Sequence, residues 1–354
     1  MTSKAKEGER AGMALYRAYR PRSFDELEGD QHVVDVLRAA IKQGKIAHAY
    51  LFAGGRGTGK TTVARILARA LGTAEEDIYE MDAASNRGIE EVRQLREGVQ
   101  TLPFVSRYKF YIIDEAHALT RDAWGAFLKT LEEPPAHAIF VLCTTELERV
   151  PDTIQSRCQI FNFKRPTHET LKKLALAVAN KEGAALAPAG AELIAMMGEG
   201  SFRDTLGILQ KVLTVSTDKK LDEEEVAKIV GAPQIALING FLRALAGKDI
   251  EQAIEAFHSG VSGGVEPKVF ALLSIAKVRG ILLMRFAPKM EKELAGQFGE
   301  DDVKFLKELA GKEGAVINSA LLAELLGALI EMPRSPLPQI PLELALYRAL
   351  GEKE

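Results

Sequence analysis

The residues Gly54-Gly55-Arg56-Gly57-Thr58-Gly59-Lys60-Thr61 match the pattern G-x-x-x-x-G-K-[ST] at every fixed position. A short apolar run at 50–53 precedes them, and residues 61–71 follow with apolar side chains at helical spacing. Glycines let backbone N–H groups turn toward phosphate oxygens, and the helix start adds partial positive charge. The stretch therefore predicts a phosphate-binding loop between a strand and a helix. We expect Lys60 to neutralise the β- and γ-phosphates and the Thr61 hydroxyl to bind Mg²⁺.

An acidic pair follows a second apolar run. Residues 110–113 are apolar and lead into Asp114 and Glu115, which places both carboxylates at the carboxyl end of a predicted strand. Alone, such a pair is more often a solvated strand end. After a phosphate loop the functional interpretation is favoured: Asp114 would hold Mg²⁺ through water, and Glu115 would orient or deprotonate the attacking water.

Polar residues at three further places in the sequence, four residues in all, each have two interpretations. Thr144 and Thr145 close the next predicted strand, where β-propensity alone explains them, or a hydroxyl there senses the γ-phosphate. Arg157 is either a surface ion-pair partner or an arginine finger that reaches a neighbouring subunit's γ-phosphate. Arg203, near the start of a predicted helix, is likewise a surface residue or part of a lid over bound nucleotide. The sequence around each residue leaves both interpretations open.

The order of elements predicts an α/β domain followed by helices. Strands are expected at 50–53, 109–113 and 138–144, and helices at 61–71 and 124–131, an alternation typical of a parallel sheet flanked by helices. After Pro166 there is no convincing strand, and Gly231-Ala232-Pro233 reads as a boundary between two helical regions. We therefore predict three domains: a nucleotide-binding core at 1–165, a small helical domain at 166–231, and a third, helical domain at 232–354.

Composition excludes several classes of protein. The chain has 354 residues, 47% hydrophobic and 27% charged, which is typical of a globular protein and not of a disordered, collagen-like or membrane protein. The net charge of −3 says little about nucleic acid and leaves a local basic face open. Cys143 and Cys158 alone form neither a disulfide framework nor a four-ligand zinc site. With no export signal at the N-terminus, we expect a reducing, cytoplasmic location.

Further motifs accompany the phosphate loop. They are Tyr16-Arg17-Ala18-Tyr19-Arg20-Pro21, Asp82-Ala83-Ala84-Ser85-Asn86-Arg87-Gly88, Leu131-Glu132-Glu133-Pro134-Pro135, Ser156-Arg157-Cys158, Gly200-Ser201-Phe202-Arg203-Asp204 and Pro341-Leu342-Glu343-Leu344-Ala345-Leu346. In this combination the chain resembles the bacterial gamma/tau subunits of the DNA polymerase III clamp loader. The resemblance runs from about Leu15 to Leu350; it is strong in the first two domains and weak between Ile235 and Met332.

The resemblance implies a fold and a function. The fold would be a RecA-like AAA+ core, a helical lid, and a helical collar that holds a hetero- or homo-pentamer together. ATP and Mg²⁺ would lie between subunits, with Asp114 and Glu115 acting in cis, Arg157 on the neighbour's ATP, Thr145 as first sensor and Arg203 as second. ATP binding would let the assembly open a ring-shaped sliding clamp and grip primed DNA, and hydrolysis would release both. The implied nucleotide-binding residues are Gly54, Gly55, Arg56, Gly57, Thr58, Gly59, Lys60, Thr61, Thr62, Tyr19, Arg20, Pro21 and Val33.

The chain departs from the family pattern in three places. Residues 71–77 bridge the position of the family's four-cysteine module without a cysteine, so no zinc is predicted. Gly29-Asp30 replaces the usual Gly-Gln, which leaves a polar nucleotide contact there open. The sequence stops at the collar, without the long tau tail that contacts helicase and polymerase.

Three rival functions remain beside the active bacterial motor. Archaeal or eukaryotic small clamp-loader subunits share the fold, but they usually carry Asn at the first sensor and lack the Glu-Glu-Pro-Pro element. A non-hydrolysing scaffold subunit would be expected to degrade the phosphate loop, whereas Lys60, Thr61, Asp114 and Glu115 are all intact. A branch-migration helicase would carry a C-terminal winged helix where this chain has a helical pattern.

Overall fold

The computed structural model describes residues 12–86, 88–290, 294, 298, 300–312 and 316–351. These residues form two compact units. The first continues through Leu171 and includes Gly198–Gly207, and the second holds Lys172–Met197 and resumes at Ile208. Helices α8 (His168–Lys181) and α10 (Phe202–Val215) each begin in the first unit and end in the second. The three-domain division with boundaries at 165 and 231 stays a prediction.

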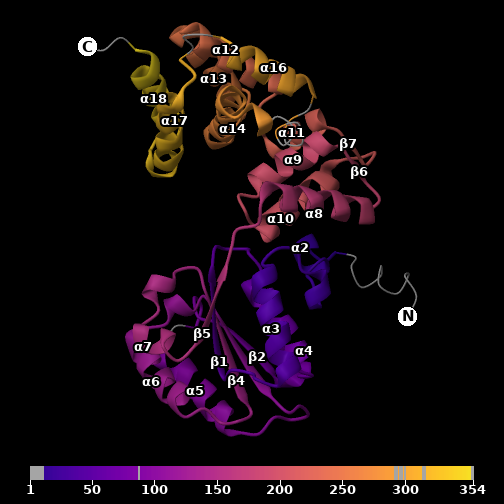
Figure 1. The fold of residues 1–354 in the computed structure, drawn as a ribbon, viewed down its shortest axis with the longest axis vertical. Coiled ribbons are helices and arrows are strands. Elements are labelled where there is room, and N and C mark those ends of the chain that lie inside the picture. The colour runs from indigo at the N-terminus through magenta and orange to yellow at the C-terminus, as the bar shows by residue number, and fades with distance from the viewer. Residues whose placement is uncertain are drawn as a thin grey trace. The chain divides into compact units, whose positions relative to one another are not determined.

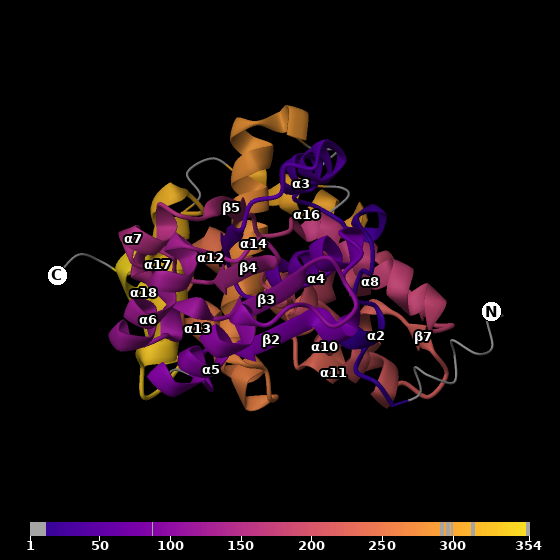
Figure 2. The same cartoon turned by 90° about the horizontal axis from the view of Figure 1, so that it is seen from below.

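The first unit is built on a five-stranded parallel sheet with the order β2-β3-β4-β1-β5. Figure 2 labels β2, β3, β4 and β5, which follow one another across the view. The predicted strands at 50–53, 109–113 and 138–144 are present, and two more strands were not predicted. Those two, β2 and β5, form the edges of the sheet, and each is only partly buried. The strands are β1 Ala49–Gly54, β2 Ile78–Asp82, β3 Lys109–Asp114, β4 Ala138–Thr144 and β5 Gln159–Phe163.

Helices cover both faces of this sheet (Figure 1). Alternate residues of each strand face opposite sides, so that Tyr50 and Phe52 pack with α3 and α4 while Leu51 packs with α5, α6 and α7. The flanking helices are α3 Gln31–Gln43, α4 Lys60–Ala70, α5 Ile89–Gln100, α6 Arg121–Glu132 and α7 Asp152–Gln155. The predicted helices at 61–71 and 124–131 correspond to α4 and α6. The Thr120 side chain caps α6 by accepting from the Ala123 N–H.

Short elements complete the first unit. They are α2 Leu15–Ala18 and the 3₁₀ turns η1 Phe24–Glu26, η2 Glu75–Asp77, η3 Ala116–Ala118 and η4 Leu147–Arg149. The Asp77 carboxylate is fully buried and accepts backbone N–H bonds from Phe104, Val105 and Ser106 at 2.6–3.0 Å. Burial by itself would raise the pKa of Asp77, but these bonds outweigh it and lower the pKa to about 2.

The region after Pro166 is mainly helical, as predicted, with one small difference. A pair of two-residue parallel strands, β6 Ala185–Leu186 and β7 Lys220–Leu221, lies among the helices where no strand was expected. Two residues are too few to give a periodic pattern, so the sequence carried no signal for them. The helices here, besides α8 and α10, are α9 Pro188–Met197 and α11 Glu223–Val230.

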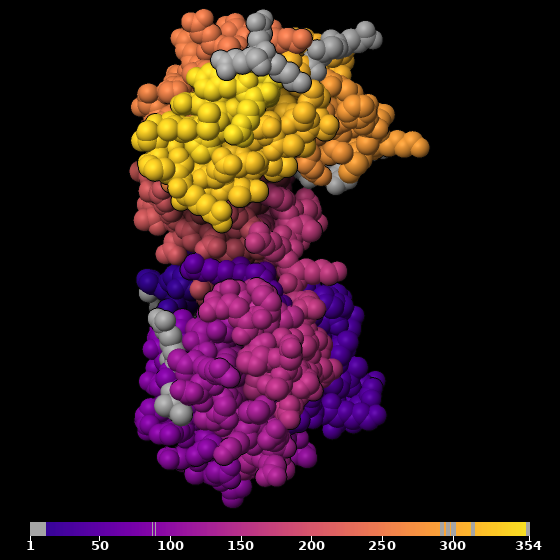
Figure 3. Space-filling model, turned by 90° about the vertical axis from the view of Figure 1, so that its left-hand side faces the viewer, coloured from indigo at the N-terminus to yellow at the C-terminus, as the bar shows by residue number. Residues whose placement is uncertain are grey.

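The remaining helices share one apolar core, to which Phe241, Phe257 and Phe270 contribute edge-to-face ring contacts. They are α12 Ile235–Gly247, α13 Ile250–Ser262, α14 Pro267–Phe286, α16 Glu300–Ala310, α17 Ser319–Glu331 and α18 Ile340–Leu350, with 3₁₀ turns η5 Pro288–Met290 and η6 Met332–Arg334. The last two long helices, α17 and α18, form the yellow surface in Figure 3. Among the described helices, none is by itself long and apolar enough to cross a membrane; α11 and α12 meet that test only as a pair bent by 84°.

Candidate functional site

The phosphate loop needs glycine for steric reasons. Gly57 and Gly59 have φ angles of 70° and 104°, a region that other residues rarely adopt. A Cβ on Gly54 would lie 2.5 Å from the Phe163 carbonyl oxygen, and one on Gly57 would lie 1.9 Å from Ser201 Oγ. The loop is also tied to the start of α10, because the Phe202 N–H donates to the Gly57 carbonyl at 3.0 Å. The predicted strand, loop and helix are therefore present in that order.

Lys60, Thr61 and Asp114 meet beneath this loop. Lys60 is buried, and its Nζ donates to the carbonyl oxygens of Gly54 and Gly55 at 2.8 Å each. From the first turn of α4, the Thr61 hydroxyl donates to Asp114 Oδ2 at 2.8 Å at the carboxyl end of β3. Burial lowers the pKa of Lys60, and the neighbouring Cys143, Glu115 and Asp114 oppose that shift.

This set fits the ligands expected from the sequence. A hydroxyl and a carboxylate oxygen are the hard ligands that Mg²⁺ prefers, and it commonly completes its shell with phosphate oxygens and water. A buried ammonium within a glycine-rich loop suits the phosphates themselves. Among the described residues no group of three or more His, Cys, Asp or Glu is arranged to hold a metal. The absence of zinc stays a prediction.

Glu115 is held beside this set in an uncommon backbone conformation. Its φ angle is 48°, in the left-handed region, and its N–H donates to Asp114 Oδ1 at 3.0 Å. The Thr145 hydroxyl donates to Glu115 Oε2 at 3.2 Å. The predicted base and the predicted first sensor are therefore direct neighbours, brought together because β3 and β4 are adjacent in the sheet.

His117 was not among the residues expected at the site. Its side chain is largely buried, and it lies against the predicted base. Its Nδ1 is 3.0 Å from Thr144 Oγ1 and 3.6 Å from Glu115 Oε2, and its Nε2 is 3.2 Å from Glu146 Oε1. Its position three residues after Asp114 was the available signal.

The implied second sensor lies in an arginine-rich corner. The Arg203 guanidinium is 5.7 Å from the centre of the Tyr16 ring, and Arg17 contacts the same ring at 5.7 Å. Burial lowers the pKa of Arg20, and the positive charges of Arg65, Arg203 and Arg17 lower it further. Arg65 is ion-paired with Glu80 there, but four arginines against one glutamate still form a suitable environment for an anion.

The other residues implied to contact the nucleotide differ in how far they are buried. Tyr19 follows α2 and, like Pro21, is partly buried, while Arg56 is exposed on the loop. Thr62 is partly buried in the first turn of α4. Val33 has no exposed surface and packs in the core with Phe52 and Val63. Their contacts with nucleotide stay predictions.

Arg157 makes its contacts elsewhere. Its Nη1 donates to the Thr153 carbonyl at 2.7 Å, and its Nη2 donates to Glu132 Oε1 at 2.8 Å. None of its hydrogen bonds in the described part of the chain goes to the phosphate loop or to Glu115. A role on a neighbouring subunit's nucleotide is compatible with that placement. The Asp82 motif lies beside Asp114 in register, and its Arg87 lies outside the described residues.

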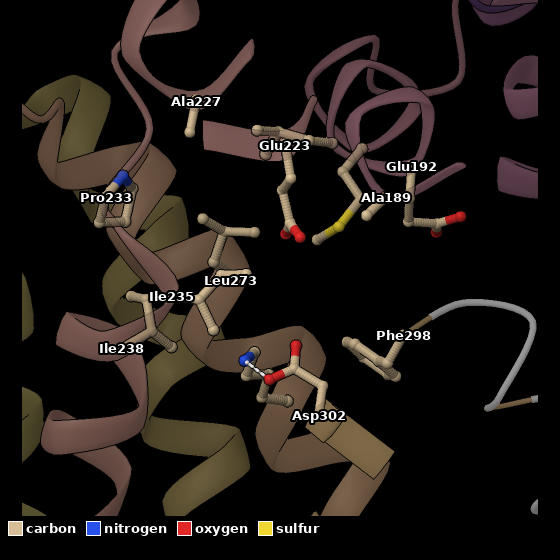
Figure 4. Close-up of a pocket in the computed structure, with 13 residues that line it drawn as sticks. Ala189, Glu192, Glu223, Ala227, Pro233, Ile235, Ile238, Leu273, Phe298 and Asp302 are labelled. Atoms are coloured by element: carbon tan, nitrogen blue, oxygen red, sulfur yellow. Dashed lines mark hydrogen bonds and ion pairs between the residues drawn. The ribbon is translucent and has the colours of Figure 1, made fainter. Parts of the chain in front are cut away.

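A separate small cavity, lined mostly by apolar side chains, lies among the helices of the second unit (Figure 4). Its volume is about 60 Å³, and the carboxylates of Glu223 and Asp302 lie at its edge. Lys277 Nζ donates to Asp302 Oδ1 at 2.7 Å and to Asn239 Oδ1 at 2.8 Å. Burial lowers the pKa of Lys277, while burial and then the Asp302 charge raise the pKa of Glu223. The space suits a water molecule or two rather than a substrate.

Comparison with known proteins gives both the fold and the family. The chain is similar to solved structures of the Thermotoga maritima RuvB Holliday junction branch migration motor, one of which matches with a TM-score of 0.52 and 23% identity over 71% of this chain and 87% of that chain. This likeness concerns the fold alone. With the parallel sheet and the helical remainder, it confirms the predicted fold class, an AAA+ core followed by helical regions.

Sequence relatives extend over most of the chain. A family model described as "DNA polymerase III, delta subunit" matches residues 29–87 and 73–167. The gamma/tau subunit of Mycobacterium tuberculosis (strain H37Rv) is 34% identical over 96% of this chain and 62% of its own length. The tau subunit of Bacillus subtilis (strain 168) is 37% identical over 78% and 53%, and that of Escherichia coli K12 is 30% identical over 95% and 55%. The chain thus spans between about half and two thirds of these relatives' length, and over that length it belongs to the DNA polymerase III gamma/tau family.

Proposed function

We propose that this protein is the ATP-driven motor subunit of a replicative clamp loader. In this proposal it works in the cytoplasm with other clamp-loader subunits, a ring-shaped sliding clamp and primed DNA. The observation that carries the proposal is the joint placement of Lys60, Thr61, Asp114 and Glu115 at the carboxyl end of the sheet in a chain of the gamma/tau family.

The binding role falls to the loop and to Lys60. The Lys60 ammonium bonds two carbonyl oxygens of the loop, and it would exchange them for the β- and γ-phosphate oxygens of ATP. Thr61 and Asp114 would hold Mg²⁺, which neutralises phosphate charge when bound. Their mutual hydrogen bond of 2.8 Å keeps both oxygens at the same place before ligands arrive.

The hydrolytic role falls to Glu115. Its carboxylate would orient the attacking water and accept its proton. The Thr145 hydroxyl restrains that carboxylate from the neighbouring strand, so Thr145 would act on hydrolysis through Glu115 as well as by sensing the γ-phosphate. Arg157 would stabilise the transition state on a neighbouring subunit's ATP, and Arg203 would act on the nucleotide of its own subunit.

The same intact set of residues favours a motor over a silent scaffold, and no specific observation favours an archaeal or eukaryotic type of subunit. The primary test is steady-state ATPase of the chain alone and with partner subunits, clamp and primed DNA at several salt concentrations. We expect strong stimulation by clamp and primed DNA together, weakening as salt rises. Two variants measure the background ATPase activity. Lys60→Ala should not bind ATP, and Glu115→Gln should bind ATP but not hydrolyse it. ATP binding with flat turnover, or stronger stimulation by a four-way DNA junction than by primed DNA, would contradict the proposal.

The trans role of Arg157 needs mixed assemblies. Subunits with Arg157→Ala lack the finger but keep their own base, and subunits with Glu115→Gln keep the finger but lack the base. When the two are mixed, fingers of the second type reach ATP on the first, so part of the activity should return. If no mixing ratio restores turnover, the finger does not act in trans.

A further inference from the structure

Two separate elements hold the Arg157 side chain. Arg157 follows α7, where the Thr153 carbonyl accepts from its Nη1 at 2.7 Å and Ser156 Oγ accepts more weakly at 3.4 Å. On the other side Glu132, the last residue of α6, accepts from Nη2 at 2.8 Å. The guanidinium is thus fixed by a backbone carbonyl of its own helix and by a carboxylate from a helix that packs against it.

These contacts leave part of the guanidinium available. The guanidinium has five N–H groups. The hydrogen bonds described above use two of them on Nη1 and one on Nη2. The Nε–H and the second Nη2 hydrogen have no acceptor among the described residues, and the side chain is 34% exposed. A phosphate takes two parallel N–H donors from one guanidinium. Arg157 can therefore keep Glu132 and still bind a phosphate.

The strength of the Arg157–Glu132 ion pair decides whether it sequesters the finger or only orients it. Both groups are partly exposed, Arg157 at 34% and Glu132 at 44%, and such pairs are worth about 0–1 kcal/mol. That is too weak to sequester the finger from a doubly charged γ-phosphate. It is enough to restrict a side chain that otherwise has about 2 kcal/mol of rotamer entropy to lose when it is fixed.

We propose that Glu132 is a positioning residue for the arginine finger: it holds Arg157 extended and oriented before a neighbouring subunit's nucleotide arrives. This inference rests on the proposed trans role of Arg157. It assigns to the first Glu of the Leu-Glu-Glu-Pro-Pro motif an effect on ATP that is bound to another chain. Glu132 itself need not touch that ATP.

The test uses assemblies in which only one kind of junction can turn over. All recipient subunits carry Arg157→Ala, so they supply a base but no finger. Donor subunits carry Glu115→Gln, so they supply a finger but no turnover of their own. The donor is then varied by adding Glu132→Ala, Glu132→Gln, or the matched control Glu133→Ala, which removes the neighbouring exposed carboxylate of the same motif.

We expect Glu132→Ala in the donor to lower kcat of the recipient's site about two- to fivefold, with KM for ATP unchanged, because the ATP is held by the recipient's own loop. Glu132→Gln keeps the acceptor oxygen without the charge, so its kcat should lie between that of the unmodified donor and that of Glu132→Ala. Glu133→Ala should match the unmodified donor. A purely structural effect would instead lower the donor's melting temperature or raise KM, and the isosteric Glu132→Gln keeps the test valid if the alanine variant folds poorly.

Two kinds of failure are distinguishable. If the unmodified donor and recipient show no shared turnover while the wild-type complex is active, the trans role of Arg157 fails, and this inference fails with it. If that pair is active but Glu132→Ala leaves its kcat unchanged or raises it, the inference alone is overturned, since a rise would mean that Glu132 restrains the finger instead of presenting it.

Discussion

Replacing Gly57 with alanine should weaken nucleotide binding by distorting the phosphate loop. Gly57 has a φ of 70°, and a Cβ there would lie 1.9 Å from Ser201 Oγ and 2.9 Å from Ser201 Cβ. Gly44 offers a matched comparison, because it has a φ of 65° and nothing within 4 Å of its would-be Cβ. Gly44→Ala therefore measures the cost of the left-handed conformation alone.

The size of the effect follows from these two terms. The left-handed conformation costs an L-residue about 1–2 kcal/mol, and forcing an extra carbon into a packed site costs about 1–3 kcal/mol more. Since about 1.4 kcal/mol is a factor of ten in affinity, Gly57→Ala should weaken ATP binding at least thirtyfold, by this order-of-magnitude sum. Ser201→Gly in the same chain leaves only Ser201 Cα near the new carbon, at 3.4 Å. It should therefore recover roughly tenfold of the loss.

The assay is a titration with a fluorescent ATP analogue at fixed Mg²⁺, paired with thermal melting of each variant. Ser201→Gly alone is the necessary control, since Ser201 Oγ also accepts the Asp204 N–H at 3.2 Å. Loss of such a capping contact to glycine costs only a few tenths of a kcal/mol. The reasoning is refuted if Gly57→Ala binds within about threefold of wild type, or if the double variant binds no more tightly than Gly57→Ala.

Three more outcomes follow from described contacts. Thr145→Val removes the donor to Glu115, so kcat should fall while ATP affinity stays within about twofold; an unchanged kcat would exclude that restraint. Asp302→Asn leaves the buried Lys277 ammonium without its anion and should destabilise the chain by about 3–5 kcal/mol in chemical denaturation, whereas the Lys277→Met/Asp302→Leu pair should be far milder; equal losses would contradict the ion-pair account. Because its pKa is lowered to about 2, Asp77 should contribute stability that is complete above about pH 4 and is lost as pH falls toward 2. Asp77→Asn should flatten the dependence of stability on pH in that range and speed hydrogen exchange at residues 104–106. An unchanged pH dependence would show that the hydrogen bonds to Asp77 do not stabilise the fold.

The sequence predicted those parts of the fold whose side chains are buried on both sides. β1, β3 and β4 are continuous apolar runs because they lie inside the sheet, and each was expected. β2 and β5 mix polar and apolar residues because they are edges, as Glu80 and Asn162 illustrate, so no strand was assigned. The α4 and α6 helices were predicted to within a few residues.

The candidate site divides in the same way. Lys60, Thr61 and Asp114 belong to local motifs whose spacing carries their chemistry, and the structure brings them together as expected. The contacts of His117 and of Glu132 depend on which strands and helices are neighbours. That order is set by packing across the whole unit. The position of His117 three residues after Asp114 placed it near the acidic pair, but the sequence contained no signal for its contact with Thr144 or for the Glu132–Arg157 pair.

The left-handed backbone at Glu115 places selection for stability and selection for activity in opposition. Holding a glutamate at a φ of 48° costs about 1–2 kcal/mol that glycine would not incur. A search for variants of higher thermal stability would therefore favour glycine at this position. On the proposed mechanism, it would obtain a more stable protein that binds ATP without hydrolysing it. β3 ends directly before this glutamate and the 3₁₀ turn η3 begins directly after it, and the two elements hold the backbone in place.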